Sequence, residues 1–463
     1  MIYFLLFLLI GLFLIAFFTS REDILAPSVI VCIMWIFSTI CAIYNIDKWG
    51  IELHANTIAA IFVGLMSFMA GSFVGRNLPN FSFGKNRKKP YGINSNETLS
   101  IIPISKMFFL MFLFIGVATV VWQFKWVMSQ VGSIGVWSEM MTAYRSGNST
   151  YSTESISKPS ILSNLELLLA VNAYVSAYIG INNIFAGDKV KRPIFLFIPG
   201  LMFAVDKILN AGRGDILFFI GAIVLCVYIS MQKKYSWKKK ISRKYVKYMI
   251  FVLVAITLLF SISRSWVGRT NQDGFLDYIT TYAGGSVQLF DMFMQAPEPA
   301  STIFGKETFH TLINYLGKIF GISEWRYISH LEFRVSNGVN VGNVYSAFRY
   351  YLYDFGWIGL MLLSAFAAIF YTYMYKKIKC NDVFDSTGFS WRILVYMYFA
   401  PSLFMFSIAD FSYALLGNVM SLLKWFVLAW IYKKIVIEHK VAFAKTSASY
   451  VFATGKSSGR ISN

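Results

Sequence analysis

The sequence contains few charged residues for its length. Asp, Glu, Lys and Arg make up 14% of its 463 residues, whereas soluble domains carry about 25%. Apolar residues make up 57%, and they recur in runs of about twenty, the length that crosses the hydrocarbon core of a bilayer. This composition excludes an ordinary soluble domain and predicts an all-α polytopic integral membrane protein.

Cysteines are few, and motifs that bind cofactors are missing. The four cysteines lack the spacing of metal ligands, which argues against a disulfide framework and a zinc site. No stretch matches a Walker loop, a dinucleotide-binding fingerprint, a serine-nucleophile elbow or a haem motif. We therefore expect no metal, no cofactor and no ATP hydrolysis.

The apolar runs predict about eleven transmembrane helices, with ten and twelve as the bounds. Spans one to eight fall within residues 1–262, with basic loops between them, and spans nine to eleven within residues 345–432. Residues 263–344 are predicted to form a large external loop, and residues 433–463 a basic tail that ends in a disordered, Ser- and Gly-rich stretch. The predicted spans cover residues 1–18, 24–44, 56–75, 107–128, 161–185, 194–210, 216–231, 248–261, 345–375, 393–409 and 414–432.

Basic residues outnumber acidic residues by 42 to 23, which gives a net charge of +19. On a soluble protein this excess would suggest nucleic-acid binding, but most of these cations lie between the apolar runs. If the linker at residues 76–106 is cytoplasmic, the predicted cytoplasmic segments hold 28 Lys and Arg residues and the external segments hold 9. Because cytoplasmic loops are enriched in Lys and Arg, this count predicts an external N-terminus, a cytoplasmic C-terminus and an external central loop. No nucleic-acid partner is expected.

The region from residue 263 to residue 354 concentrates the polar chemistry of the chain. It contains two of the four histidines, five arginines and eight acidic residues. Arg264 and Arg269 follow the eighth predicted span directly, in the stretch SRSWVGRT. Cations that flank a span are favoured on the cytoplasmic side, whereas these two are predicted to be external. They either anchor the end of the span or contribute to an electropositive pocket at the external headgroup level.

Arg213 and Asp215 lie in AGRGDILFF, where one predicted span turns into the next. Glycines flank the arginine on both sides, so a ligand or a backbone can approach its guanidinium group closely. The fixed fork of guanidinium donors suits a phosphate or a diphosphate. The alternative interpretation is a glycine turn with an adjacent ion pair. On the first interpretation, Arg213 joins Arg264 and Arg269 in binding an anionic, lipid-linked substrate.

The stretch ISHLEFRVSNG places His330, Glu332 and Arg334 at alternate positions. In an extended chain the three side chains share one face, whereas in a helix they spread apart. Histidine side chains ordinarily titrate near neutral pH, so His330 is a candidate base for a hydroxyl proton. A histidine in a loop is also often just solvated. Glu332 is the second candidate for the base, and Asp291 and Glu324 remain open.

Arg349 and Asp354 lie where the chain re-enters the membrane, in YSAFRYYLYDFGWIG. A charge within a span is costly, so it usually faces a partner or a cavity. These two side chains therefore either satisfy charges within the bundle or contribute to a substrate site. The predicted span at residues 345–375 is long enough to be broken or tilted near residues 354–356.

Three of these features together resemble bacterial O-antigen polymerases of the Wzy type. They are the glycine-flanked arginine that opens a span in AGRGDILFF, the long external loop, and the stretch NVYSAFRYYLYDFGWIG that leads into the next span. The plan of about eleven spans extends the resemblance over essentially the full chain.

The resemblance implies a membrane glycosyltransferase of the C superfamily that needs neither a metal nor a nucleotide sugar. Such an enzyme moves a growing glycan from an undecaprenyl-diphosphate carrier onto a new lipid-linked repeat unit, at the periplasmic face of the bacterial inner membrane. A protein that regulates chain length is an expected partner. External arginines of the family hold the diphosphates, and the matching residues here are Arg213, Arg264, Arg269 and Arg334.

The remaining roles are expected to fall on other residues of the external region. Arg326 or Arg334 would hold the acceptor, and Arg349 belongs to the same set of substrate-binding candidates. His330 would correspond to the external histidine of the related O-antigen ligases. A ligase is therefore one alternative function, and a lipid-linked oligosaccharide flippase or another transporter is a second. The sequence shows no duplicated half, which is the repeat signature of many transporters.

Overall fold

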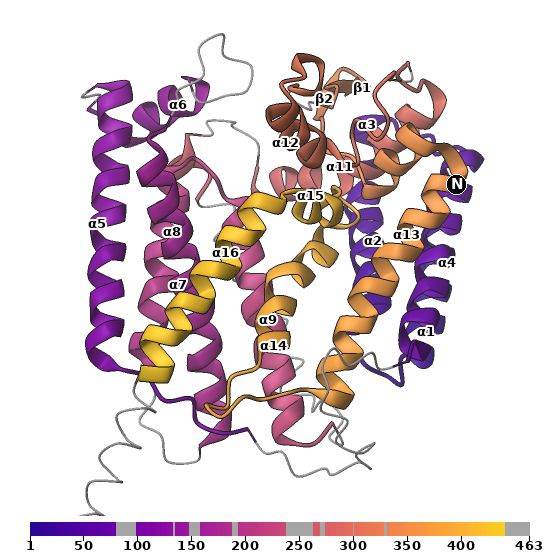
Figure 1. The fold of residues 1–463 in the computed structure, drawn as a ribbon. Coiled ribbons are helices and arrows are strands. Elements are labelled where there is room, and N and C mark those ends of the chain that lie inside the picture. The colour runs from indigo at the N-terminus through magenta and orange to yellow at the C-terminus, as the bar shows by residue number, and fades with distance from the viewer. Residues whose placement is uncertain are drawn as a thin grey trace, which may run out of the picture.

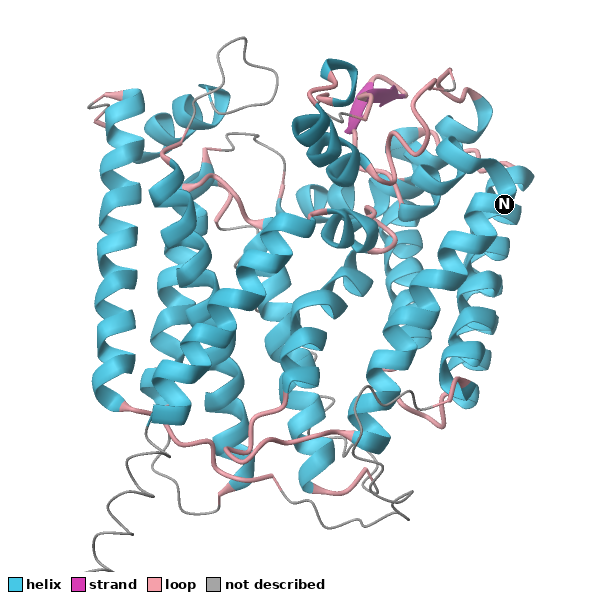
Figure 2. Cartoon of the chain, viewed as in Figure 1, coloured by secondary structure: helices cyan, strands magenta, loops and turns pink. Residues whose placement is uncertain are grey.

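The structure is a computed structural model of the chain, and it describes residues 1–79, 99–132, 135–147, 158–187, 193–237, 263–268, 274–299, 301–327 and 331–439. Figure 1 shows a bundle of helices that run between two ends, and Figure 2 shows that helices dominate the described residues. The α12 end is the upper one in Figure 1, where α12 and the hairpin lie, and the opposite end holds the C-termini of α1, α4 and α13.

The elements follow in chain order. The long helices are α1 (Ile2–Thr19), α2 (Pro27–Tyr44), α4 (Ala55–Asn77), α5 (Lys106–Val131), α7 (Ser160–Ala186), α9 (Gly214–Lys234), α11 (Phe275–Gln295) and α13 (Ala347–Asn381). The shorter α-helices are α3 (Ile46–Trp49), α6 (Trp137–Gly147), α8 (Ile198–Leu209), α12 (His310–Phe320), α14 (Trp391–Phe399), α15 (Phe411–Gly417) and α16 (Val419–Tyr432). The remaining elements are the 3-10 helices η1 (Ile194–Phe197), η2 (Ser265–Val267), η3 (Ser323–Trp325) and η4 (Ala400–Met405), the π-helix η5 (Lys433–Glu438), and the strands β1 (Arg334–Ser336) and β2 (Val339–Gly342).

Among the described residues, seven helices are long and apolar enough to cross a membrane, and the number rises to eight if one bent pair counts as a span. The seven are α1, α2, α4, α5, α7, α9 and α13, and each coincides with a predicted span. The bent pair joins α15 to the helix that continues through Glu438, at an angle of 75°. The chain is therefore an all-α membrane protein.

The four other predicted spans are not among these seven helices. The segments at residues 194–210 and 393–409 each combine a 3-10 helix with an α-helix, of 12 residues in α8 and 9 residues in α14. The predicted span at residues 248–261 lies outside the described residues. The count of eleven spans therefore stays a prediction. The predicted tail begins as the π-helix η5, and its residues after 439 also lie outside the described ranges.

Helix α7 is enclosed by the bundle, whereas α1 and α5 lie at its edges (Figure 1). In α7, 78% of the most apolar stretch is buried, against 28% in α1 and in α5. Large apolar side chains on the outer helices, such as Phe7 and Phe114, are mostly exposed. In a bilayer these outward faces would contact lipid, because hydrocarbon accepts apolar side chains as readily as a protein core does.

Glycines allow α4 and α13 to pack closely. A Cβ atom added at Gly71 would lie 2.3 Å from the carbonyl oxygen of Ala365, and one added at Gly75 would lie 2.9 Å from that of Ile369. Small residues at a helix interface let the two backbones approach, which is how membrane helices commonly associate. Any larger side chain at Gly71 would push α13 away from α4.

Helix α13 changes direction at Gly356. This residue has φ 62° and ψ −157°, which is not helical and lies in a region that glycine adopts readily. The break separates a first segment, at the α12 end, from the long segment that crosses the bundle. The predicted break near residues 354–356 is therefore confirmed.

The region predicted as a large external loop, residues 263–344, contains substantial helix. Helix α11 packs against α2, and a Cβ atom added at Gly284 would lie 2.5 Å from the backbone nitrogen of Ala42. Helix α12 and the antiparallel hairpin β1–β2 follow at the α12 end (Figure 2). Sequence reasoning did not predict α11, because polar residues such as Gln288 and Asp291 interrupt its apolar pattern although both are buried. The placement of residues 263–344 as an external segment between two spans stays a prediction.

The hairpin is fixed by its turn and by contacts to the bundle. Asn337 and Gly338 have φ of 49° and 74°, as in the type I′ turn that an Asn-Gly pair favours. The hydroxyl of Ser336 donates 2.7 Å to the carbonyl of Trp49 and accepts 3.0 Å from Nε2 of Gln288. The hairpin therefore rests on α3 and α11.

Candidate functional site

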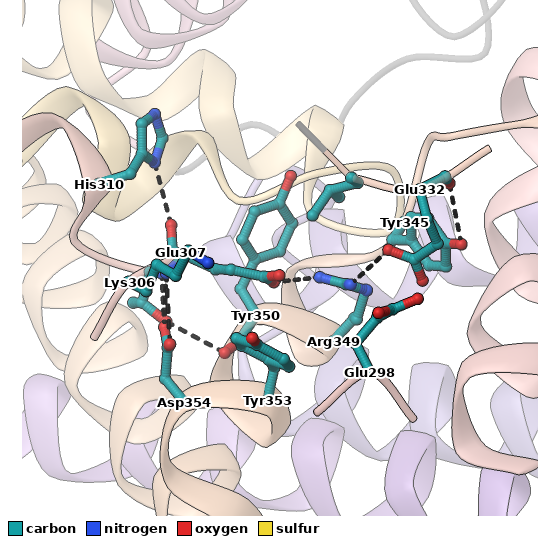
Figure 3. A network of polar contacts seen from close by, with 12 residues as sticks. Glu298, Lys306, Glu307, His310, Glu332, Tyr345, Arg349, Tyr350, Tyr353 and Asp354 are labelled. Atoms are coloured by element: carbon teal, nitrogen blue, oxygen red, sulfur yellow. Dashed lines mark hydrogen bonds and ion pairs between the residues drawn. The ribbon is translucent and has the colours of Figure 1, made fainter. Parts of the chain in front are cut away.

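Two groups of arginines lie at the α12 end. The Tyr278 cluster consists of Arg213, Arg264 and Tyr278. The Arg349 cluster consists of Arg349, Arg334, Glu307 and Glu332, and Figure 3 shows Arg349 with the two glutamates. Both contain residues that the sequence singled out.

The Tyr278 cluster begins with a tight turn between α8 and α9. Ala211 has a left-handed φ of 55°, and the N–H of Gly212 donates 3.0 Å to the carbonyl of Lys207. This closes the C-terminus of α8 and leaves Arg213 as the residue immediately before α9. Arg213 is buried, so the turn directs its side chain into the protein.

Arg213 and Arg264 meet on one aromatic ring. The guanidinium carbons lie 5.4 Å and 5.7 Å from the ring centroid of Tyr278, and Nη2 of Arg213 donates to the Tyr278 hydroxyl. Cations within about 6 Å of a ring centroid are attracted by the negative face of the ring. The two arginines were predicted to lie together, and Tyr278 is the residue that joins them. Arg269, the third member of the prediction, lies outside the described residues.

A cavity of about 330 Å³ is lined by Gly214 and Asp215, the two residues that follow Arg213 in the chain. Its walls come from α7, α8, α9, α14, α15 and α16. It is mostly apolar, with six aromatic residues in its lining and polar side chains from Ser163, Glu166, Lys207 and Asp215. Asp215, which the sequence paired with Arg213, is exposed and lines this cavity. The volume lies at the lower end of the range for small-molecule sites, which is about 300–1,000 Å³.

The polar rim of the cavity is held by a network. Nζ of Lys158 lies 2.6 Å from Oε1 of Glu166, and the side-chain nitrogen of Asn210 donates 3.2 Å to the same oxygen. Nζ of Lys207 lies 3.2 Å from a carboxylate oxygen of Asp206. These contacts tie the α12 ends of α7 and α8 together beside Arg213.

In the Arg349 cluster, a single guanidinium group is held between two carboxylates (Figure 3). Nη1 of Arg349 donates to Glu307, and Nη2 donates 2.8 Å to Glu332. The second carboxylate oxygen of Glu332 lies 3.0 Å from Nη2 of Arg334. The rings of Phe293, Tyr345 and Tyr353 surround the Arg349 guanidinium, with centroids 4.8, 4.6 and 5.5 Å away.

The environment of Glu307 raises its pKa. Burial of the carboxyl group is the largest cause, and the Arg349 charge opposes it, while Asp354 and Glu332 add to it, so that the pKa rises from 4.5 to about 7. Glu307 was not a sequence candidate. Nothing in the sequence pairs Glu307 with Arg349, which lies 42 residues later in the chain. The two side chains meet only in the folded protein.

Asp354 binds backbone rather than the Arg349 side chain. Its carboxylate accepts from the N–H of Glu307 at 3.1 Å and from that of Thr308 at 2.6 Å. The hydroxyl of Thr308 in turn donates 3.2 Å to the carbonyl of Tyr350. The sequence left open whether Arg349 and Asp354 satisfy charges within the bundle or contribute to a substrate site. Their contacts favour the first alternative for both side chains. Together they fasten the segment before α12 to the start of α13.

The other sequence candidates are placed as follows. Glu332 and Arg334 contact each other as residues of an extended chain would, whereas His330 lies outside the described residues. Arg326 is exposed, and its Nε donates 3.1 Å to the carbonyl of Gly317 at the end of α12. Asp291 is buried and accepts from the backbone and ring nitrogens of His54, each at 2.9 Å.

Helix α11 sets the distance between the two clusters. Tyr278 lies near its start, and Phe293, which contacts Arg349, follows fifteen residues later. At 1.5 Å per residue the two positions are about 22 Å apart. One glycosidic bond cannot span this separation, so the two clusters are distinct.

Sequence reasoning missed Tyr278, Glu166 and Lys207 as well as Glu307. Glu166 and Lys207 carried a usable signal, because each is a charge within a predicted span, and such charges usually face a cavity or a partner. Nothing in the sequence distinguishes Tyr278 from the other tyrosines. Within the described ranges, no three His, Cys, Asp or Glu side chains gather so that they could hold a metal ion.

Comparison of this chain with protein-family models, with curated proteins and with solved structures finds no match. The residues and their geometry therefore carry the argument about function.

Proposed function

We propose that this protein is a membrane-embedded glycosyltransferase that polymerises undecaprenyl-diphosphate-linked oligosaccharide repeat units, as O-antigen polymerases do. It acts at the α12 end, which the distribution of Lys and Arg predicts to be the periplasmic face of the bacterial inner membrane. The donor and the acceptor are both lipid-linked glycans.

The observation that carries this proposal is the meeting of Arg213 and Arg264 on the ring of Tyr278, with a cavity lined by the two residues that follow Arg213 in the chain. Guanidinium groups bind diphosphate oxygens through paired hydrogen bonds. The mostly apolar cavity, whose lining includes six aromatic residues, suits the apolar carrier or the face of a sugar ring. This combination supports a substrate that joins a diphosphate to lipid and glycan.

In the proposed reaction, a hydroxyl oxygen of the acceptor sugar attacks the anomeric carbon of the donor glycan. The bond between that carbon and the diphosphate oxygen breaks, and the lipid diphosphate leaves with the electron pair. Arg213 and Arg264 stabilise the charge that develops on it, as fixed donors do in other transfer reactions. Asp215, which lines the adjoining cavity, accepts the hydroxyl proton.

This assignment of the base differs from the expectation from the sequence. Glu332 lies in the Arg349 cluster, about 22 Å along α11 from the arginines that hold the leaving group. A base must lie within hydrogen-bonding reach of the proton that it accepts, which favours Asp215 over Glu332. The Arg349 cluster then has a positioning role, and His330 stays a candidate from the sequence alone.

The test is a gel ladder of surface polysaccharide from a strain that lacks the gene. The strain is complemented with wild type, Arg213→Ala, Asp215→Asn or Lys48→Ala. The last is the matched control, since Lys48 is a half-exposed cation at the same end that pairs with Asp277 at 3.4 Å. We expect a ladder from wild type and Lys48→Ala, and single-repeat glycan from the other two variants at normal protein level.

Other results would point to the alternative functions. Surface glycan that is absent altogether in the deletion strain would indicate a flippase. Full-length polymer that remains on its lipid carrier would indicate a ligase. An unchanged ladder in the deletion strain would contradict the proposal, and a full ladder from Asp215→Asn alone would remove Asp215 as the base.

A further inference from the structure

A second cavity lies at the opposite end of the bundle, away from both arginine clusters. Its volume is about 510 Å³, and it is formed where α1 and α4 end, α2 begins and the last turns of α13 pass. The lower part of Figure 1 shows these helix ends together. The proposed glycosyl transfer does not use this cavity, so its chemistry needs a separate explanation.

Four cations and one carboxylate line this cavity. The carboxylate is Asp23, and the cations are Arg21, Arg76, Lys376 and Lys379. Glu22 is next to Arg21 in the chain but does not line the cavity. Even when every lining charge is counted, the cavity is strongly electropositive.

Asp23 is already fully engaged by neighbouring groups. Nζ of Lys379 lies 2.8 Å from its carboxylate, and the hydroxyls of Tyr228 and Tyr375 donate to it at 2.7 Å and 3.0 Å. Asp23 is also buried. It therefore balances Lys379 and is not placed to neutralise the other three cations.

Two of those three cations are held by neutral oxygens. Nε of Arg76 donates 3.3 Å to the carbonyl of Ser72, and Nη1 donates to that of Thr19. Nζ of Lys376 donates 2.7 Å to the carbonyl of Leu78. Carbonyl oxygens orient a cation without cancelling its charge, so both side chains keep a fixed position and a full positive charge beside the cavity.

The third cation, Arg21, is held by an unusual backbone. Arg21 and Glu22 have consecutive left-handed φ values of 59° and 61°, which residues other than glycine rarely adopt. This turn directly follows α1 and places Arg21 at the cavity, where its side chain is exposed. Such local strain persists only where the surrounding structure determines it, and it is concentrated at functional sites.

The cavity also has hydroxyl groups and a side opening. Ser20, Ser28, Ser72 and Thr372 line it, and hydroxyls complete the coordination of phosphate oxygens well. Phe73 forms part of the wall and is 64% exposed on the outer face of α4. The cavity therefore reaches the surface of the bundle that faces the membrane, at the level where helices end and headgroups lie.

We propose that this cavity binds the phosphate headgroup of an anionic glycerophospholipid. Basic pockets between membrane helices at the cytoplasmic side bind lipid phosphates in this way, and the cation distribution predicts that this end is cytoplasmic. The phosphate lies between Arg21, Arg76 and Lys376, and the acyl chains pass Phe73 into the bilayer. The proposal is independent of the glycosyltransferase assignment, because no catalytic group is involved.

The test measures lipid binding by the full-length protein, purified and delipidated in dodecyl maltoside micelles. Phosphatidylglycerol, phosphatidylcholine or inorganic phosphate is added, and binding is followed by native mass spectrometry and by the shift in Tm. The variants are Arg21→Gln, Lys376→Gln and the two combined. Lys434→Gln is the matched control, since Lys434 is a half-exposed cation at the same end that pairs with Glu438 outside the cavity.

We expect phosphatidylglycerol to bind wild type at least tenfold more tightly than phosphatidylcholine. Each cavity substitution should weaken that binding about fivefold, the change that corresponds to about 1 kcal/mol per cation, and the double variant about 25-fold. Lys434→Gln should bind as wild type does. Arg21 is exposed, so Arg21→Gln tests the proposal even if Lys376→Gln does not fold.

Three results would overturn the proposal. Equal binding of the two lipids by wild type would show that headgroup charge is not recognised. Stabilisation by inorganic phosphate alone, at the same concentration and to the same extent, would identify a site for a free anion rather than a lipid. An equal loss of lipid affinity in Lys434→Gln would show that binding depends on surface charge in general and not on this cavity.

Discussion

At the Tyr278 cluster two guanidinium groups share one uncharged ring, whereas at the Arg349 cluster one guanidinium lies between two carboxylates and three rings. Both clusters sit at the same end of the bundle and use the same kind of side chain. Arg349 joins two carboxylates from distant parts of the chain and so holds the fold together. On the proposed function, Arg213 and Arg264 bind the diphosphate of the substrate. The contacts that an arginine makes, more than its presence, indicate its role.

The largest effect is expected from Arg349→Ala. This change leaves Glu307 and Glu332 facing each other in a buried site, and loss of one partner of a buried ion pair costs about 3–5 kcal/mol. The Tm of the purified protein should fall strongly, together with its level in the membrane. Arg326→Ala, at an exposed arginine, is the control. An unchanged Tm for Arg349→Ala would break the distinction between the two clusters.

Arg213→Ala should affect activity instead of stability. Loss of one donor that stabilises developing charge typically lowers the rate about 100-fold, so polymer formation should nearly stop while Tm changes little. Quantitative gels and a thermal melt of the same preparation measure both. If Arg213→Ala lowered Tm as much as Arg349→Ala does, both arginines would be structural.

The carboxyl group of Glu307 gives the Arg349 cluster a pH dependence. Its folded-state pKa of about 7 lies above the ordinary value of 4.5, so the folded protein binds more protons than the unfolded chain between these values. Stability should therefore be greatest at low pH and fall by about 3 kcal/mol as the pH rises from 4.5 to 7. Glu307→Gln should remove most of this slope in Tm against pH.

The control for that experiment is Glu298→Gln. Glu298 is half exposed and lies 4.0 Å from Arg334, so its substitution should leave the slope intact. A slope of equal size in Glu307→Gln would assign the pH dependence to another group.

The smallest effect is expected from Lys48→Ala. Lys48 pairs with Asp277 across 3.4 Å, and both side chains are 39% exposed. Exposed ion pairs contribute about 0–1 kcal/mol, so neither Tm nor polymer length should change measurably. A clear loss of activity would mean that any cation at this end supports the reaction. The Tyr278 cluster would then have no specific role in it.

Much of the fold could be predicted from hydropathy, and much less of the site. Apolar runs located seven helices that are long enough to span, because in a bilayer each helix satisfies its own backbone. Helix α11 was missed because its buried face carries polar groups, among them Gln288 and Asp291. Their partners, Ser336 and His54, come from distant parts of the chain.

The same reason limits what the sequence reveals about the arginines. The pairing of Arg213 with Arg264 was predictable, since both arginines lie at the ends of apolar runs that were predicted to reach the same face of the membrane. The neutralisation of Arg349 was not, because Glu307 becomes its partner only when the segment before α12 folds over α13. Contacts between distant segments determine which charges are cancelled, and no local pattern encodes them.

The most direct test of the central claim uses purified protein in liposomes with lipid-diphosphate-linked repeat units as the only substrates. The reaction products are separated by chain length, for wild type, Arg213→Ala and Lys48→Ala. The account predicts glycans of two or more repeat units and released lipid diphosphate with wild type and Lys48→Ala, and neither product with Arg213→Ala. Polymer from Arg213→Ala at the wild-type rate would contradict it, and so would the absence of polymer from correctly folded wild-type protein.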